Sequence, residues 1–206
     1  GLGSANGSRT GASPLAEMME NLTKKPNISV ITCMGNEANN KCHYKGTVMS
    51  ALVPDVMEIN VDGTGKGFTM EIWADSLDIL SVSIESPSGE YVPRIPARMG
   101  ASMEYTFLYE GSTVTVDYQI TENVAGMEVI FVRLKTPVEG TWKFYIYSLT
   151  NIKGSYNAWL PLKQFSGQDI YFLKSDPDTT LTVPAAADGV ISVGAYNHYT
   201  GAAYYE

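Results

Sequence analysis

The sequence of 206 residues has few of the features that mark membrane proteins, disulfide-bonded scaffolds or nucleic-acid-binding proteins. No apolar run approaches the roughly 20 residues that a membrane-spanning helix needs. Two cysteines, Cys33 and Cys42, are too few for a disulfide framework, and we expect two unlinked thiols. The net charge of −8 argues against nucleic acid or an anionic membrane surface as the main partner.

Histidine is equally scarce, with His43 and His198 alone in the chain. Two histidines and two cysteines without ligand spacing argue against a zinc site. The start Gly1-Leu2-Gly3 is not a dinucleotide fingerprint, because no strand leads into it and the third glycine is out of place. We therefore expect neither a metal nor an organic cofactor.

The composition is that of a globular protein, with 44% apolar and 17% charged residues. Residues 1–46 have α/β character. Ser13 before Pro14 predicts the start of a helix over 14–24, whose apolar residues recur at helical spacing. Residues 28–34 form an almost unbroken β-prone run, typical of a strand buried on both faces of a parallel sheet.

Residues 47–165 follow a different pattern, in which short runs of alternating apolar and polar residues are separated by turn signals. The clearest runs are 68–73, 80–84, 113–118, 128–133 and 142–147. Many short strands separated by such turn signals predict an antiparallel β-sandwich. Residues 166–206 return to α/β character, with an apolar strand over 190–193. The order predicts a mainly β chain, in which a β-sandwich is inserted between two partial segments of an α/β domain.

Several motifs occur in an order that resembles one known family. The glycine loop at 2–7 is followed by a helix and by a strand that ends in Gly35-Asn36-Glu37. Further motifs are the runs at 38–46, 86–89, 140–142, 158–161, 179–184 and 190–197. Together they resemble the subtilisin-like serine proteases (subtilases), in the clostridial branch that includes the germination proteases and carries an inserted jelly roll.

The resemblance implies an internal piece of a serine endopeptidase, bacterial and either secreted or spore-associated. The family presents aspartate, histidine and serine in that order, and this chain begins after the first two and ends before the third. We therefore expect it to be inactive alone. The implied partners are a peptide or protein substrate and the parent's own prodomain. The jelly roll would stiffen the protease or bind that prodomain.

Asn36 is the one catalytic candidate. A side-chain amide aimed at the carbonyl oxygen stabilises the charge that develops there in acyl transfer. From the residues alone, a turn residue after Gly35 is the commoner use of Asn36; the resemblance implies the oxyanion role. It also implies that Leu2 and Gly3 pair with the substrate backbone, and that Cys33, Met34 and Gly35 border the pocket for the side chain before the cut bond. Core packing is the alternative for Met34.

Other residues with suggestive chemistry fit less well. Neither histidine stands in the family's catalytic motif, so both are expected to be loop or surface residues. Residues 62–65 faintly resemble the family's aspartate motif but are better interpreted as a hairpin turn. The middle aromatic residues are expected to fill the core, with a few left as an exposed platform: Trp73, Tyr91, Tyr105, Tyr109, Tyr118, Trp142, Tyr145 and Tyr147.

Two alternative functions stay open. One is a carbohydrate- or protein-binding β-sandwich module with no link to proteolysis, which would not need the flanking α/β strands. The other is a pseudoprotease, inactive even at full length, since the triad positions lie outside these residues.

Overall fold

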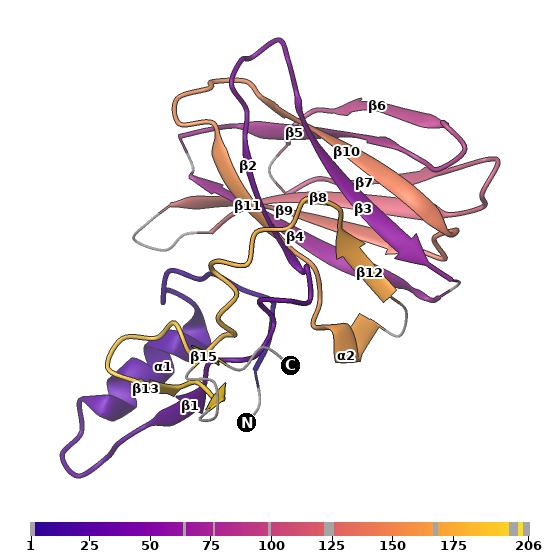
Figure 1. Cartoon of the computed structure of the whole chain (residues 1–206). Coiled ribbons are helices and arrows are strands. Elements are labelled where there is room, and N and C mark those ends of the chain that lie inside the picture. The colour runs from indigo at the N-terminus through magenta and orange to yellow at the C-terminus, as the bar shows by residue number, and fades with distance from the viewer. Residues whose placement is uncertain are drawn as a thin grey trace. The chain divides into compact units, whose positions relative to one another are not determined.

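The computed structural model describes residues 3–63, 65–75, 77–98, 100–121, 126–166, 169–197 and 202–203. The chain forms two compact units (Figure 1), one of residues 1–40 with 177–206 and the other of residues 41–176. We call the first the α/β unit and the second the sandwich unit. Neither described helix is long and apolar enough to cross a membrane.

The sandwich unit contains two antiparallel sheets. The six-stranded sheet has the order β2 (His43–Thr47), β11 (Ser155–Trp159), β4 (Gly67–Asp75), β9 (Met127–Lys135), β8 (Thr113–Thr121) and β7 (Ser102–Thr106). The five-stranded sheet has the order β12 (Asp169–Phe172), β3 (Asp55–Asp62), β10 (Gly140–Ser148), β5 (Leu80–Glu85) and β6 (Tyr91–Ile95). A single helical turn, α2 (Lys163–Ser166), precedes β12. This arrangement confirms the predicted mainly β, jelly-roll β-sandwich class.

One hydrophobic core lies between the two sheets, because each strand alternates apolar and polar residues with a period of two. Along β10, Trp142, Phe144 and Ile146 are completely buried, while the residues between them are partly exposed. The inner residues of β4 and β9 belong to the same cluster. The alternation in the sequence therefore identifies the buried face of these strands.

The sandwich unit is longer than the predicted insert of 47–165. It includes β2, which pairs with β11 from His43↔Trp159 to Thr47↔Ser155, and β12, which pairs with β3. The amide of Asp176 also donates to the carbonyl oxygen of His43 at 2.9 Å. These backbone bonds bring residues 41–46 and 166–176 into the sandwich.

The α/β unit contains one helix and short strands. Helix α1 spans Pro14–Thr23, and the Ser13 hydroxyl accepts a hydrogen bond from the amide of Ala16 at 3.2 Å, as expected of an N-cap. Strand β1 (Ile31–Cys33) pairs in parallel with β13 (Ile191–Val193), and β14 (Tyr196–Asn197) pairs with β15 (Ala202–Ala203). The predicted helix over 14–24 is confirmed.

Strand β1 differs from the prediction of a strand over 28–34 buried on both faces. It has three residues, and the side chain of Ile31 is 67% exposed. Its partner β13 is similarly open, with Ile191 at 53%. Among the described residues the parallel sheet has only these two strands, so its faces have too few neighbours to bury them. The parallel direction of pairing agrees with the prediction.

Candidate functional site

The β1–β13 pair determines where the candidate residues lie. Its register runs from Ile31↔Ile191 to Cys33↔Val193, and the next amide, of Met34, donates to the carbonyl oxygen of Val193 at 3.0 Å. The residues after Met34 therefore leave the sheet at the carboxyl end of β1. In α/β folds this is the edge at which ligands bind.

Gly35 turns the chain at this edge. Its φ of +89° lies in the left-handed region, which glycine adopts without strain. A Cβ atom at Gly35 would lie 2.6 Å from Cγ2 of Thr182. The close contact and the positive φ both require glycine here, and the turn leaves the Asn36 side chain exposed directly after the strand.

The residues after Asn36 form a compact turn. Glu37 is buried, and its carboxylate accepts a hydrogen bond from the Asn40 side-chain amide at 2.9 Å. The Asn40 backbone amide donates to the Glu37 carbonyl oxygen at 3.0 Å. This turn holds the chain on the far side of Asn36, so both neighbours of the candidate residue have defined conformations.

Thr182 links three segments of the α/β unit, and the sequence did not single it out. Its side chain is 3% exposed, and its amide donates to the Met34 carbonyl oxygen at 3.0 Å. Its hydroxyl lies 3.4 Å from the carbonyl oxygens of Cys33 and Met34. A Cβ at Gly3 would lie 2.4 Å from that hydroxyl oxygen, so Gly3, like Gly35, makes room for Thr182.

The segment beside Gly3 is held by an antiparallel bridge. The amide of Ser4 donates to the Val183 carbonyl oxygen at 3.0 Å, and the Val183 amide donates to the Ser4 carbonyl oxygen at 2.9 Å. The following peptide bond, to Pro184, is cis. Of the two residues predicted to pair with the substrate backbone, Gly3 lies against residues 182–184, whereas Leu2 lies outside the described residues.

A cavity of about 770 Å³ lies within the α/β unit. Most of its lining is apolar, contributed by Gly3, Ser4, Leu15, Met19, Ile31, Thr32, Cys33, Val183, Pro184 and Val193. Two predicted substrate-binding residues, Gly3 and Cys33, therefore share one cavity. Met34, Gly35 and Asn36 do not line it.

Met34 makes a packing contact. A Cβ built on Gly194 would lie 3.0 Å from the Met34 sulfur, so the thioether occupies the space above that glycine. Met34 itself is half-buried. This contact supports the packing alternative for the Met34 side chain. The Met34 carbonyl oxygen accepts the hydrogen bond from the Thr182 amide independently of this side-chain contact.

His43 is neither a loop nor a surface residue, contrary to the prediction, because it begins strand β2 and is shielded from solvent within the sandwich unit. Its side chain is completely buried and stacks on the Trp159 ring, with ring centroids 5.0 Å apart. The Nε2 atom lies 3.0 Å from the side-chain oxygen of Asn157. Nδ1 lies 3.1 Å from the carbonyl oxygen of Asp176. Both ring nitrogens are engaged, which leaves none for general-base chemistry. His198 lies outside the described residues.

The motif at 62–65 is not a hairpin turn, contrary to the prediction. Asp62 ends β3 and Gly67 begins β4, and these two strands belong to different sheets. The connection therefore crosses from one layer of the sandwich to the other. Thr64 lies outside the described residues.

The aromatic residues of the sandwich divide between core and surface. Tyr118 and Trp142 are buried in the core between the sheets, and Trp73 is buried in a separate cluster with Val129 and Trp159. Tyr105, Tyr145 and Tyr147 are half-buried, whereas Tyr91 and Tyr109 are 44% and 83% exposed. The core prediction therefore holds for Tyr118 and Trp142, and Tyr105 packs against the same core, whereas the other five do not fill it.

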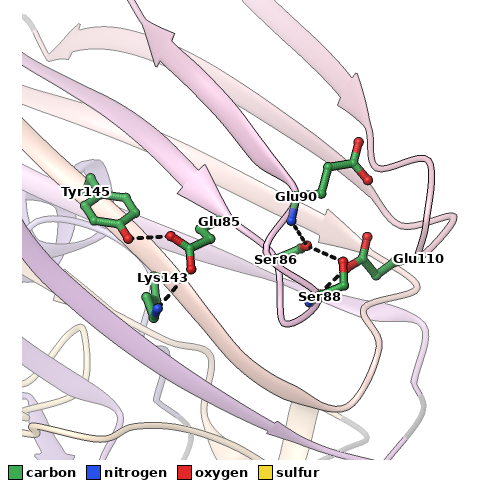
Figure 2. Close-up of polar contacts among 7 residues, drawn as sticks. All are labelled: Glu85, Ser86, Ser88, Glu90, Glu110, Lys143 and Tyr145. Carbon is green, nitrogen blue, oxygen red and sulfur yellow. Dashed lines mark hydrogen bonds and ion pairs between the residues drawn. The ribbon is translucent and has the colours of Figure 1, made fainter.

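Glu85 organises a polar network on the outer face of the five-stranded sheet (Figure 2). Its carboxylate accepts hydrogen bonds from the Tyr145 hydroxyl at 2.5 Å and from the Lys143 ammonium at 2.9 Å. The bond to Tyr145 lowers the pKa of Glu85, and it raises the pKa of Tyr145 to about 12. Both groups keep their ordinary charge at neutral pH, so the network stabilises the sheet without a group ready for proton transfer.

A second network joins two turns at one end of the sandwich. The Ser88 hydroxyl donates to the Glu110 carboxylate at 2.5 Å, and the Glu90 amide donates to the Ser86 hydroxyl at 3.1 Å (Figure 2). The Ser88–Glu110 bond connects the β5–β6 turn to the β7–β8 turn, and the Glu90–Ser86 bond closes the β5–β6 turn itself. Within the described parts of the chain, no group of three metal-ligating side chains occurs here or elsewhere.

No family model matches the sequence, and no curated protein does. Among solved structures, the chain is similar to the CspB protease of Clostridium perfringens, with a TM-score of 0.83 and 24% identity over 99% of this chain. The chain spans 42% of that protein's length. Similarity at this level of identity shows a shared fold, and this chain therefore has a protease-related fold along nearly its whole length.

Proposed function

We propose that this chain is the part of a subtilisin-like serine endopeptidase that carries the oxyanion asparagine, Asn36, together with an accessory β-sandwich. The observation that carries the proposal is the position of Asn36. Its side chain is exposed directly after a parallel strand and beyond the left-handed turn at Gly35. In this proposal the triad serine, histidine and aspartate come from parts of the protein outside these 206 residues.

In the proposed reaction the serine hydroxyl attacks the scissile carbonyl carbon while the histidine takes its proton. The carbonyl oxygen then carries a negative charge, and the Asn36 side-chain amide donates a hydrogen bond to it. A fixed donor of this kind is worth about 10²–10³ in rate. Gly35 on one side and the Glu37–Asn40 turn on the other supply the rigid backbone that such a donor needs.

The proposed substrate contacts lie near the carboxyl end of β1, as Asn36 does. Gly3 lies beside the Ser4–Val183 bridge, and Cys33 ends β1 next to it in the shared apolar cavity. An apolar substrate side chain would fit such a lining better than a charged one, because nothing there would pair with a buried charge. Gly35 and Met34 would border this region through their backbone, with Leu2 as the second proposed edge residue.

The test is made on the full-length protein. Its complete coding sequence is first read for Asp-Ser/Thr-Gly, His-Gly-Thr and Gly-Thr-Ser motifs. Asn36→Ala is then expected to lower kcat on peptide substrates by about 10²–10³, with KM changed only a few-fold, because the lost donor acts in the transition state. Asn60→Ala, a polar truncation in the sandwich unit, serves as the matched control and should leave kcat unchanged.

Thermal unfolding, together with the nearly unchanged KM, separates loss of oxyanion stabilisation from misfolding. The Asn36→Ala protein should still present a folded site that binds substrate. An unchanged kcat would remove Asn36 from the mechanism. A full-length protein with the subtilase frame but without the three triad motifs would be a pseudoprotease, and the endopeptidase proposal would be wrong.

A further inference from the structure

A second, smaller cavity lies in the sandwich unit, with a volume of about 250 Å³. Its lining comes from the loop before β5, from β5 itself, from β6 and the segment after it, and from the loop after β10: Ile79, Ser81, Arg94, Pro96, Ala97 and Leu149. Four of these six residues are apolar. The two polar residues are Ser81 and the cationic Arg94.

Arg94 is held in place by two contacts. Its Nε donates a hydrogen bond to the Ser81 hydroxyl at 2.6 Å, and Ser81 is itself only 3% exposed. The guanidinium lies over the ring of Tyr147, 4.8 Å from the ring centroid. The hydrogen bond to Ser81 fixes the end of the aliphatic stem, and the contact with Tyr147 fixes the plane of the guanidinium group. Arg94 is therefore preorganised, unlike a flexible surface side chain.

The terminal nitrogens of Arg94 have no protein acceptor among the described residues. The other well-placed cations have acidic partners, such as Arg133 with Asp117 at 2.9 Å and Lys143 with Glu85 at 2.9 Å. Two parallel N–H groups in a fixed plane match the two oxygens of a carboxylate. The unused side of Arg94 therefore has the geometry of a carboxylate receptor.

The apolar part of the cavity limits the ligand. Leu149 is 65% exposed and Ile79 is 37% exposed, so both present aliphatic surface beside the arginine. The loop carrying Leu149 is tied to the loop carrying Ile79, because the Leu149 amide donates to the Ile79 carbonyl oxygen at 2.8 Å. The two aliphatic walls thus keep a fixed spacing. A volume of 250 Å³ holds one aliphatic side chain but not a drug-sized molecule.

We propose that this pocket binds a carboxylate carried on a small aliphatic group, the chemistry of a peptide C-terminus ending in leucine or valine and of a free aliphatic amino acid derivative. The carboxylate oxygens accept from the terminal nitrogens of Arg94, and the aliphatic group packs on Ile79, Pro96 and Leu149. The proposal goes beyond proteolysis and does not rest on it, because every residue involved belongs to the sandwich unit.

Binding to the whole chain is measured by calorimetry and by amide chemical shifts with four probes. They are N-acetyl-leucine, its amide, an acetylated Ala-Ala-Ala-Ala-Leu peptide with a free C-terminus, and the same peptide amidated. The two acids should bind saturably, and the two amides at least tenfold more weakly, because they lose the charge that Arg94 recognises. Tighter binding of the peptide acid than of N-acetyl-leucine assigns the pocket to peptide C-termini. Equal binding assigns it to small carboxylates.

Variants locate the site. Arg94→Gln should weaken binding of both acids at least tenfold, and Arg94→Lys, which keeps the charge but not the planar fork, should weaken it several-fold. Arg133→Gln is the matched control and should bind as the unaltered chain does. Thermal unfolding monitors the fold of each variant. Equal binding of acids and amides, undiminished binding by Arg94→Gln, or no saturable binding of either acid would overturn the proposal.

Discussion

Gly35 and Thr182 illustrate how a single backbone position controls the candidate site. Gly35 combines a φ of +89° with a neighbouring methyl group 2.6 Å from the place of its absent Cβ. Gly7, in the same unit, has a φ of +106° but only an ordinary contact, at 3.8 Å from Val183. Alanine substitutions at Gly7 and at Gly35 therefore separate two free-energy costs, that of the left-handed backbone conformation and that of the steric clash with Thr182.

We expect Gly7→Ala to destabilise the α/β unit by about 1 kcal/mol through backbone strain alone. Gly35→Ala should cost about 2–4 kcal/mol, since the clash with Thr182 adds to the strain. Amide hydrogen exchange of the β1 residues, which reports local opening, is the measurement. Adding Thr182→Ser removes the clashing methyl and should recover part of the loss. Equal costs for the two alanine variants would contradict the contact.

At this scale the sequence indicates the residues that belong to a motif but not their tertiary neighbours. The resemblance to the subtilases makes Asn36, Gly3 and Cys33 candidates, and Gly3 and Cys33 share the apolar cavity. Thr182 stands far from them in sequence, and its place in the run 179–184 does not indicate which residues it contacts. Only the three-dimensional structure shows that two glycines leave room for it.

Asp78 shows how one side chain organises a whole connection between strands. Its buried carboxylate accepts from the backbone amides of Ile152, Lys153 and Gly154 at 2.7, 2.9 and 2.6 Å. Burial alone would raise the pKa of Asp78, but these amides outweigh it and lower the pKa. The loop between β10 and β11 is therefore anchored through its backbone rather than through its own side chains.

Asp78→Asn should destabilise the sandwich by about 1.5–3 kcal/mol, because hydrogen bonds to an ionised acceptor are stronger than neutral ones. Exchange of the amides at 152–154 should accelerate. As Asp78 has a lowered pKa in the folded state, its contribution is present above the pKa of a free carboxyl group and is lost as the pH falls further. Asp169→Asn, in an exposed pair with Lys163, should change urea stability by less than about 0.5 kcal/mol. Similar losses in both variants would argue against the anchor.

The strands themselves were partly predictable. Runs with strict alternation correspond to β4, β5, β8, β9 and β10, since half-buried antiparallel strands impose that period. Strand β2 was not anticipated, because its five residues include His43 and Tyr44, which are buried next to polar neighbours. The pairing order of the strands depends on contacts between distant segments, which periodicity along one segment does not encode.

Glu128 makes the stability of the whole sandwich depend on pH. It is 2% exposed, and the Leu80 amide donates to one of its oxygens at 2.9 Å, while the other oxygen has no protein partner. Burial and, to a smaller extent, the nearby Asp78 charge raise the pKa of Glu128 from 4.5 to about 7, although the hydrogen bond from the Leu80 amide lowers it. The folded protein therefore holds this proton more tightly than the unfolded chain does.

For a carboxyl group with a raised pKa, the favourable contribution is present below about pH 4.5 and is lost as the pH rises toward 7. Glu128→Gln removes that dependence and keeps an oxygen for the Leu80 amide. We expect the variant to be more stable than the unaltered chain at pH 8, by up to about 3 kcal/mol. The advantage should shrink as the pH falls to 5. Urea unfolding at pH 5, 6, 7 and 8 measures it, and a difference independent of pH would contradict the assignment.

The parallel pair β1–β13 joins segments that the entire sandwich separates in sequence. If the intervening chain were unfolded, the pairing would have to close a very long loop and lose the corresponding entropy. Once the sandwich has folded, the bond between Asp176 and His43 holds its two chain ends together, so the loop left to close has a few tens of residues. This shortening lowers the closure penalty by about 1.5–2 kcal/mol. Folding of the sandwich thus lowers the entropy cost of pairing β1 with β13, the strand pair that leads to the candidate residue Asn36.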